Sequence, residues 1–233
     1  MGQRVLYLYE NGIGAINLAY RKSAVGLDHS RSVHPLTLLR VSQIITTLLG
    51  EEFKVINPFL FWTKAEMCRT LAEEKRTDLP PVTMSCDSPH RRHPVQCGYC
   101  SSCILRRQAL VASGIEDRTQ YIVPHGMRPA GDSTVHLLHM LEQVSTLRNL
   151  LSISDTCNLQ WASLTQRFPE LDDVVDRLAL AENLPSVDIR QRLIQLYQAY
   201  VAEWNTVESA ISGDLLSQVD THQVSNEYLV AAQ

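Results

Sequence analysis

Apolar positions in the first sixty residues predict two short strands of the buried type. Residues 4–9 form a nearly continuous apolar run that closes at Gly12, and residues 54–58 repeat the pattern. Residues 14–18 predict a further extended piece. Each run is too short for a helix of ordinary length.

Helical periodicity fills the intervals between these strands. Residues 36–49 are amphipathic and precede Gly50, a residue suited to end a helix. Thr63 and Glu66 form a capping box that predicts a helix over residues 64–75. Because strand, helix, strand and helix follow in order, the sequence predicts a parallel α/β layer of two or three strands.

After residue 130 the pattern is helical throughout. Two apolar stripes recur at helical spacing: Leu137, Leu138, Leu141, Val144, Leu147, Leu150 and Leu151, then Ile189, Leu193, Leu196, Tyr197, Tyr200, Trp204 and Val207. Core packing is the simpler interpretation of both stripes. The alternative is that Trp204 and the tyrosines form a surface for a partner.

Composition favours a cytoplasmic globular protein. The chain has 233 residues, 45% of them hydrophobic, and a net charge of −4, which argues against a dedicated binder of duplex DNA. The N-terminal MGQRVLYLYENG has no apolar core of signal-peptide type, and no stretch approaches the length of a membrane span. In the reducing cytoplasm, clustered cysteines are expected to be metal ligands or redox thiols.

Four cysteines predict a closed, structural zinc site. Cys86, Cys97, Cys100 and Cys103 are spaced C-x10-C-x2-C-x2-C, and two-residue gaps allow a tight turn to aim two thiolates at one ion. Gly98 lets backbone amides turn toward the sulfurs. The last ligand is expected on the first turn of a helix that ends at Gly114.

Three alternatives to this ligand set are open. His90 or His93 could replace one cysteine as a ligand. An iron–sulfur cluster is the second alternative, although the ferredoxin pattern would continue with C-x3-C-P and this chain continues with Ile104. Unmetallated thiols are the third.

Two isolated cysteines and two adjacent arginines are better explained by structural or solvated positions than by a functional role. Cys68 and Cys157 each stand alone in an apolar helical pattern, which is typical of small buried hydrophobic residues. Arg106 and Arg107 could bind a phosphate, but paired arginines on a short helix are more often a solvated face.

The ordered motifs resemble a known family. TMSC followed by CGYCSSCILRRQALVASGIED resembles the C-terminal zinc segment of the 7-cyano-7-deazaguanine synthases, the QueC group of PP-loop ATP pyrophosphatases. Four upstream pieces in the same order resemble the later half of the divergent QueC-like proteins of bacterial defence operons: residues 9–18, 31–35, 57–59 and 63–67. The resemblance covers about residues 5–123.

The resemblance implies a partial PP-loop (HUP-type) parallel sheet and a ligase reaction. In that reaction, ATP adenylates 7-carboxy-7-deazaguanine, ammonia forms the amide, and a second adenylation leads to the nitrile of queuosine biosynthesis. Asn11, Arg31 and His34 would line the substrate side, and zinc would be structural. No catalytic residue is assigned.

The phosphate-binding SGGxDS loop of that family is missing from the sequence. The closest string, residues 23–30, has one glycine where the motif needs two adjacent ones, and His29 separates Asp28 from Ser30. Residues 10–14 contain two glycines but resemble no phosphate loop. We therefore expect a C-terminal piece or split subunit that binds ATP and Mg²⁺ only with an upstream PP-loop half, and that is inactive and prone to aggregate alone.

The expected organisation has four parts. Residues 1–80 form the partial α/β domain, 81–125 the zinc-binding cysteine segment, 126–212 the helical region, and 213–233 a flexible tail. The alternative function is a non-catalytic, zinc-stapled module that binds operon partner proteins or nucleic acid, as in an anti-phage defence system.

Overall fold

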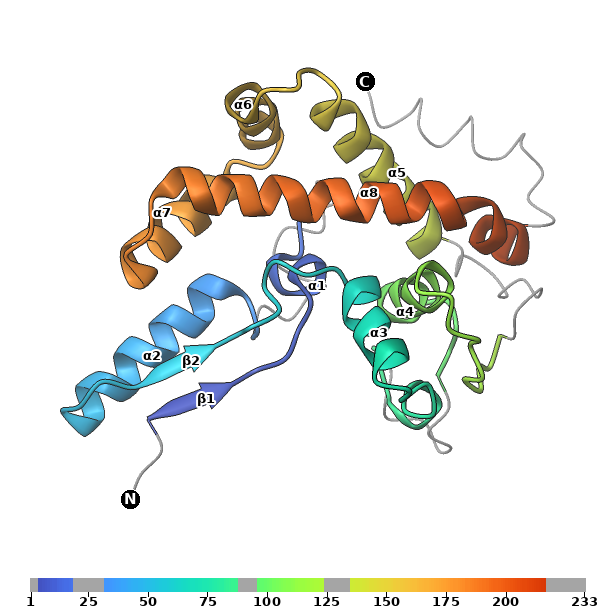
Figure 1. The fold of residues 1–233 in the computed structure, drawn as a ribbon, viewed down its shortest axis with the longest axis horizontal. Coiled ribbons are helices and arrows are strands. Elements are labelled where there is room, and N and C mark those ends of the chain that lie inside the picture. Colours follow the sequence, from blue (N-terminus) through green and yellow to red (C-terminus); the bar gives the residue numbers. More distant parts are fainter. Residues whose placement is uncertain (1–3, 19–31, 88–95, 124–134, 217–233) are drawn as a thin grey trace.

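The computed structural model describes residues 4–18, 32–87, 96–123 and 135–216, which are mostly helical (Figure 1). Its elements are β1 (Val5–Tyr7), α1 (Gly12–Ile16), α2 (Pro35–Leu49), β2 (Lys54–Ile56), α3 (Lys64–Glu73), the 3₁₀-helix η2 (Pro80–Val82), α4 (Ser101–Ala112), α5 (Val135–Leu151), α6 (Cys157–Arg167), α7 (Glu170–Glu182) and α8 (Ser186–Leu216). Among these residues, no helix is long and apolar enough to cross a membrane.

The predicted parallel layer is present as a two-stranded sheet. β1 and β2 pair in parallel, with Val5 opposite Lys54 and Tyr7 opposite Ile56. The prediction that both strands are buried is wrong for β1, because Leu6 and Tyr7 are 47% and 51% exposed. A strand with one neighbour and an uncovered face leaves its apolar side chains at the surface.

Helix α2 runs along the outer edge of β2. The Val55 amide donates to Ser42 Oγ at 2.8 Å, and the Phe53 amide donates to Thr46 Oγ1 at 2.9 Å. Thr46 Oγ1 donates in turn to the Phe53 carbonyl at 3.2 Å. Side chains of α2 therefore satisfy the backbone groups that β2 turns away from β1.

The capping signals predicted from the sequence are present. Gly50 ends α2 in the left-handed conformation, with φ of 68°. At the start of α3, the Glu66 amide donates to Thr63 Oγ1 at 3.1 Å, and the Thr63 amide donates to Glu66 Oε2 at 2.6 Å. These bonds satisfy amides that a helix start leaves without a partner.

The prediction of an extended segment over residues 14–18 is wrong, because most of it belongs to α1. Asn11 caps this short helix by accepting the Gly14 amide on its side chain at 3.0 Å. The helix ends at Asn17, whose φ is 49°. An asparagine at each end therefore determines a helix that the apolar pattern alone does not reveal.

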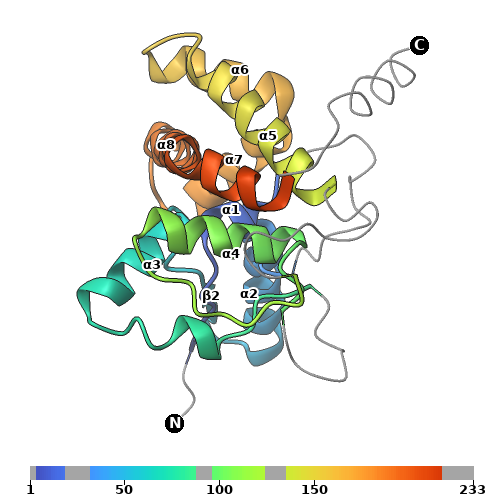
Figure 2. The ribbon, with the colours of Figure 1, turned by 90° about the vertical axis from the view of Figure 1, so that its right-hand side faces the viewer.

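The four C-terminal helices pack with α1 and α4 around one hydrophobic core. Helix α8 crosses the whole molecule, with α5 and α6 on one side and α1 and α4 on the other (Figures 1 and 2). One cluster of buried side chains joins Ala15 and Ile16 of α1, Ile104 of α4, the whole of the second predicted stripe and most of the first. Leu141 and Leu150 of the first stripe are partly buried against this cluster, and Leu138 does not belong to it. Trp204 is fully buried, which excludes the alternative of a partner surface there.

Candidate metal centre and adjoining cavity

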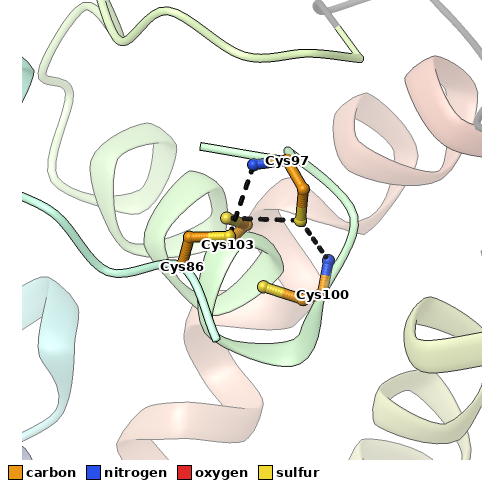
Figure 3. Close-up of side chains that lie close together, drawn as sticks. All are labelled: Cys86, Cys97, Cys100 and Cys103. Carbon is orange, nitrogen blue, oxygen red and sulfur yellow. Dashed lines mark hydrogen bonds between the residues drawn. The ribbon is translucent and has the colours of Figure 1, made fainter. Parts of the chain in front are cut away.

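The four predicted ligands lie together and are all buried. Cys86 follows η2, Cys97 and Cys100 belong to the turn before α4, and Cys103 lies in the first turn of that helix (Figure 3). Their sulfur atoms all lie within 4.8 Å of one another. Cys86 therefore lies with the other three cysteines, as the spacing predicted, whereas His90 and His93 lie outside the described residues.

The spacing and surroundings of the sulfurs fit a tetrahedral metal ion. Zinc–sulfur bonds of about 2.3 Å place neighbouring sulfurs about 3.8 Å apart, and Cys97 Sγ lies 3.8 Å from Cys103 Sγ. The amides of Tyr99 and Cys100 donate to Cys97 Sγ at 3.4 and 3.2 Å, and the Cys97 amide donates to Cys86 Sγ at 3.5 Å. Such donors stabilise thiolate ligands.

Ionisation within the cluster also favours a bound cation. Hydrogen bonds from the Cys100 and Cys103 thiols, together with backbone amides, hold the pKa of Cys97 far below its usual value. The Cys100 thiol has a raised pKa because it donates to its cysteine neighbours and is buried. Four thiolates this close together repel one another, so a cation among them is needed to keep all four sulfurs ionised.

Gly98 makes the tight turn between Cys97 and Cys100 possible. Its φ is 88°, and a Cβ there would lie 2.6 Å from the Val123 carbonyl oxygen and 2.7 Å from Arg107 Nη2. Only glycine combines this left-handed conformation with so close a neighbour.

Gly98→Ala is therefore expected to destabilise the metal centre. We expect a loss of about 2–4 kcal/mol, because left-handed strain adds to a steric clash with backbone. Urea denaturation of the metal-loaded protein measures it. Gly114→Ala is the matched control, since Gly114 has φ of 70° but open space around its Cα, and it should cost only about 1–2 kcal/mol. Equal losses would contradict the argument.

The two arginines of α4 are buried, so the prediction of a solvated face is wrong. Arg106 donates through Nη1 to Thr83 Oγ1 at 2.9 Å and through Nη2 to Thr119 Oγ1 at 2.9 Å, and also bonds the Pro80 carbonyl. Arg107 donates to the Val123 carbonyl and its guanidinium lies 4.2 Å from the centre of the Tyr121 ring. Both side chains fasten the segments that flank the cysteines, and a phosphate role is not supported.

The two isolated cysteines are less buried than predicted. Cys68 on α3 and Cys157 at the start of α6 are both half-buried free thiols. Burial raises the pKa of the Cys68 thiol. Neither lies in the metal cluster.

A cavity of about 900 Å³ opens beside the cysteine cluster. Cys86, Cys97 and Cys100 form part of its wall, so the candidate metal centre adjoins the cavity. Leu105 of α4 and Met140 of α5 supply apolar surface. Polar groups reach the cavity from several parts of the chain, among them Glu10 and Asn11 before α1, Lys64 of α3, Asp87 beside Cys86, and His136, His139 and Gln143 of α5.

The three predicted substrate residues differ in their positions. Asn11 is buried at the cavity wall, where its side chain also caps α1 and bonds Glu10. His34 is buried and caps α2, its Nδ1 accepting the Leu36 amide at 3.3 Å, and it does not line the cavity. Arg31 lies outside the described residues. A role in substrate binding stays a prediction for each of them.

Sequence reasoning missed the charged and titratable residues of the cavity. Lys64 is the first residue of α3 and its Nζ lies 4.0 Å from Glu10 Oε1. His136 and His139 are separated by three positions on α5, so they share one helix face. That spacing was readable in the sequence, but nothing local showed that the face turns toward the cysteines.

Comparison with known proteins identifies part of the chain. Residues 37–114 match the family described as queuosine biosynthesis protein QueC. The matched segment runs from α2 through α4, includes all four cysteines, and is QueC-like. No curated protein and no solved structure matches the chain.

Proposed function

We propose that this QueC-like chain is part of a 7-cyano-7-deazaguanine synthase-type ligase whose ATP-binding half lies on another polypeptide segment. The assembled enzyme would convert 7-carboxy-7-deazaguanine, ATP and ammonia to the amide and then the nitrile. The cysteine cluster would hold one structural Zn²⁺, and the assembly would work in the cytoplasm.

One observation carries this proposal: the QueC match includes the cysteine cluster, and the cluster forms a wall of the large cavity. A volume of about 900 Å³ lies within the range of small-molecule sites. The cavity combines apolar walls for an aromatic base with Lys64, a cation suited to a carboxylate or phosphate. Four bound thiolates leave a tetrahedral metal no open position, which supports a structural role for it.

The backbone around α1 supports an ATP site outside this chain. A phosphate loop needs free amides at a helix start. Here the Gly12 amide donates to the Trp62 carbonyl at 2.8 Å, and the Gly14 amide donates to Asn11 Oδ1 at 3.0 Å. Both amides are therefore used within the fold, and the sequence contains no SGGxDS string elsewhere.

The divergent, defence-associated subtype is a further part of the proposal. It rests on the ordered resemblance of residues 9–18, 31–35, 57–59 and 63–67. Genomic neighbourhood tests it: an adjacent reading frame with SGGxDS among defence genes supports the assignment, and a neighbourhood of queuosine genes alone contradicts it.

Activity requires the phosphate-loop polypeptide. We expect the chain co-expressed with the polypeptide encoded directly upstream to produce AMP from ATP when 7-carboxy-7-deazaguanine and ammonia are present, and the chain alone to produce none. Lys64→Met should lower the rate about 100-fold, because it removes a charge from the cavity wall. Lys54→Met is the control, since Lys54 is exposed on β2 and away from the cavity.

Two results would overturn this assignment. Saturable binding of Mg-ATP to the chain alone in calorimetry would contradict an ATP site elsewhere. An assembled pair that is folded and metal-loaded but releases no AMP would favour the non-catalytic interaction module instead.

A further inference from the structure

We propose that the open edge of β1 is the docking site for a strand of the phosphate-loop partner, and that this strand runs parallel to β1. The identity of the partner rests on the proposed function; the existence of the docking edge rests on the geometry of the sheet. The two edges of this sheet differ in how their backbone groups are satisfied.

The β2 edge is closed within the chain. Ser42 and Thr46 of α2 accept hydrogen bonds from the Val55 and Phe53 amides at 2.8 and 2.9 Å. Natural sheets protect an edge by covering it in such ways, because unpaired strand groups recruit other strands. No further strand can join the sheet on this side without displacing α2.

No element among the residues that the structure describes covers the β1 edge. The Leu8 amide donates to the Ile56 carbonyl at 2.9 Å, and the Lys54 amide donates to the Arg4 carbonyl at 2.9 Å. Because successive residues of a parallel strand face opposite edges, Val5 and Tyr7 turn their backbone groups away from β2. The residues that the structure describes provide no hydrogen-bond partner for these groups.

Apolar surface continues from this edge across the same side of the molecule. Tyr9 is 66% exposed, and its ring centre lies 6.5 Å from that of Tyr7 and 5.8 Å from that of Phe59. The aromatic series leads into an apolar groove of about 520 Å³ whose wall includes Met67 and Met84. Because Tyr7 and Tyr9 share one face of the strand, a partner covers this surface if it packs on that face as well as pairing with β1.

The direction of the added strand follows from the position of the large cavity. β1 leads directly into Glu10 and Asn11, which lie at the cavity, and Asn57 after β2 donates to the Glu10 carbonyl at 2.8 Å. Parallel sheets bind ligands beyond the carboxyl ends of their strands. Only a parallel neighbour would bring the loop after its own strand, where a phosphate loop belongs, to the cavity.

A second copy of this chain fits the edge less well. A two-fold axis would pair β1 with β1 in antiparallel orientation and would place the two cavities at opposite ends. It would also supply no phosphate loop. We therefore assign the edge to the partner polypeptide.

Proline substitution separates the open edge from the paired one. Val5→Pro removes only an amide that faces outward, and proline is tolerated at such edge positions. We expect the variant chain to melt within about 2 °C of the wild type but to lose copurification with the upstream polypeptide and the AMP-forming activity. Leu6→Pro is the matched control, because the Leu6 amide faces β2 and its loss should lower the melting temperature of the chain alone.

Photo-crosslinking identifies the occupant. A benzoylphenylalanine residue at Tyr7 of the co-expressed full chain should link to the strand that precedes the SGGxDS loop, while the same residue at exposed Leu159 of α6 should not. Links from Tyr7 to a second copy or to residues 217–233 of the same chain would overturn the proposal, as would an active complex that tolerates Val5→Pro. The two proposals can also fail separately. If Tyr7 crosslinks to the partner and Val5→Pro dissociates the complex, but the wild-type complex forms no AMP, the docking edge is supported and the proposed ligase is contradicted.

Discussion

Cys100→Ser is expected to reduce bound zinc from about one ion per chain to nearly none and to unfold the segment around residues 86–121. The site is closed, so loss of one thiolate leaves three ligands and an open position in a buried centre. Elemental analysis after gel filtration gives the metal content. Thermal unfolding followed by circular dichroism should show a melting temperature lower by about 10 °C or more.

Cys157→Ser is the control for this variant, because Cys157 lies at the start of α6 and outside the cluster. It should keep a full complement of metal and an unchanged melting temperature. Iron with inorganic sulfide in the wild-type protein would contradict the zinc assignment. Unaltered zinc in Cys100→Ser would contradict the four-ligand site.

Glu203→Ala is expected to lower the free energy of unfolding by about 3 kcal/mol. The Glu203 carboxylate is buried on α8 and accepts from Thr63 Oγ1 at 2.7 Å, Arg69 Nη2 at 2.9 Å and Gln108 Nε2 at 3.3 Å. Its removal leaves polar groups of α3 and α4 without an acceptor. The Arg69 contribution is small because that side chain is 41% exposed and screened by water.

Glu208→Ala on the same helix is the matched control. Its carboxylate is 44% exposed and pairs with Arg148 at 3.4 Å, so its loss should change the free energy of unfolding by at most about 1 kcal/mol. Urea denaturation of both variants, with metal present, makes the comparison. Similar effects of the two substitutions would show that the buried network contributes little.

Local signals predicted the parts of the fold that depend on neighbouring residues. The Thr63 and Glu66 capping box and the terminal Gly50 place helix ends within a few residues, because the bonds join groups close in sequence. The same is true of the cysteine turn, where Gly98 and two short gaps already aim the thiolates. Cys86 could be predicted as the fourth ligand because it is the nearest remaining cysteine in the sequence.

The parts that were missed depend on distant segments. The burial of Arg106 is determined by Pro80, Thr83 and Thr119, which no helical pattern on α4 reveals. The exposure of β1 arises because no layer of the described part of the chain covers it, which an apolar run in the sequence cannot reveal. The cavity joins residues from before α1, from α3 and from α5, so its composition requires the tertiary structure.

The long helix α8 couples the metal centre to the rest of the chain. It packs against α1, α4, α5, α6 and α7, and its Glu203 bonds Gln108 of the helix that carries Cys103. A metal at 1,000 times its dissociation constant stabilises the native state by about 4 kcal/mol. Because α8 contacts both the helix that carries Cys103 and the other C-terminal helices, chelation should lower the stability of those helices and accelerate hydrogen exchange at amides far from the sulfurs.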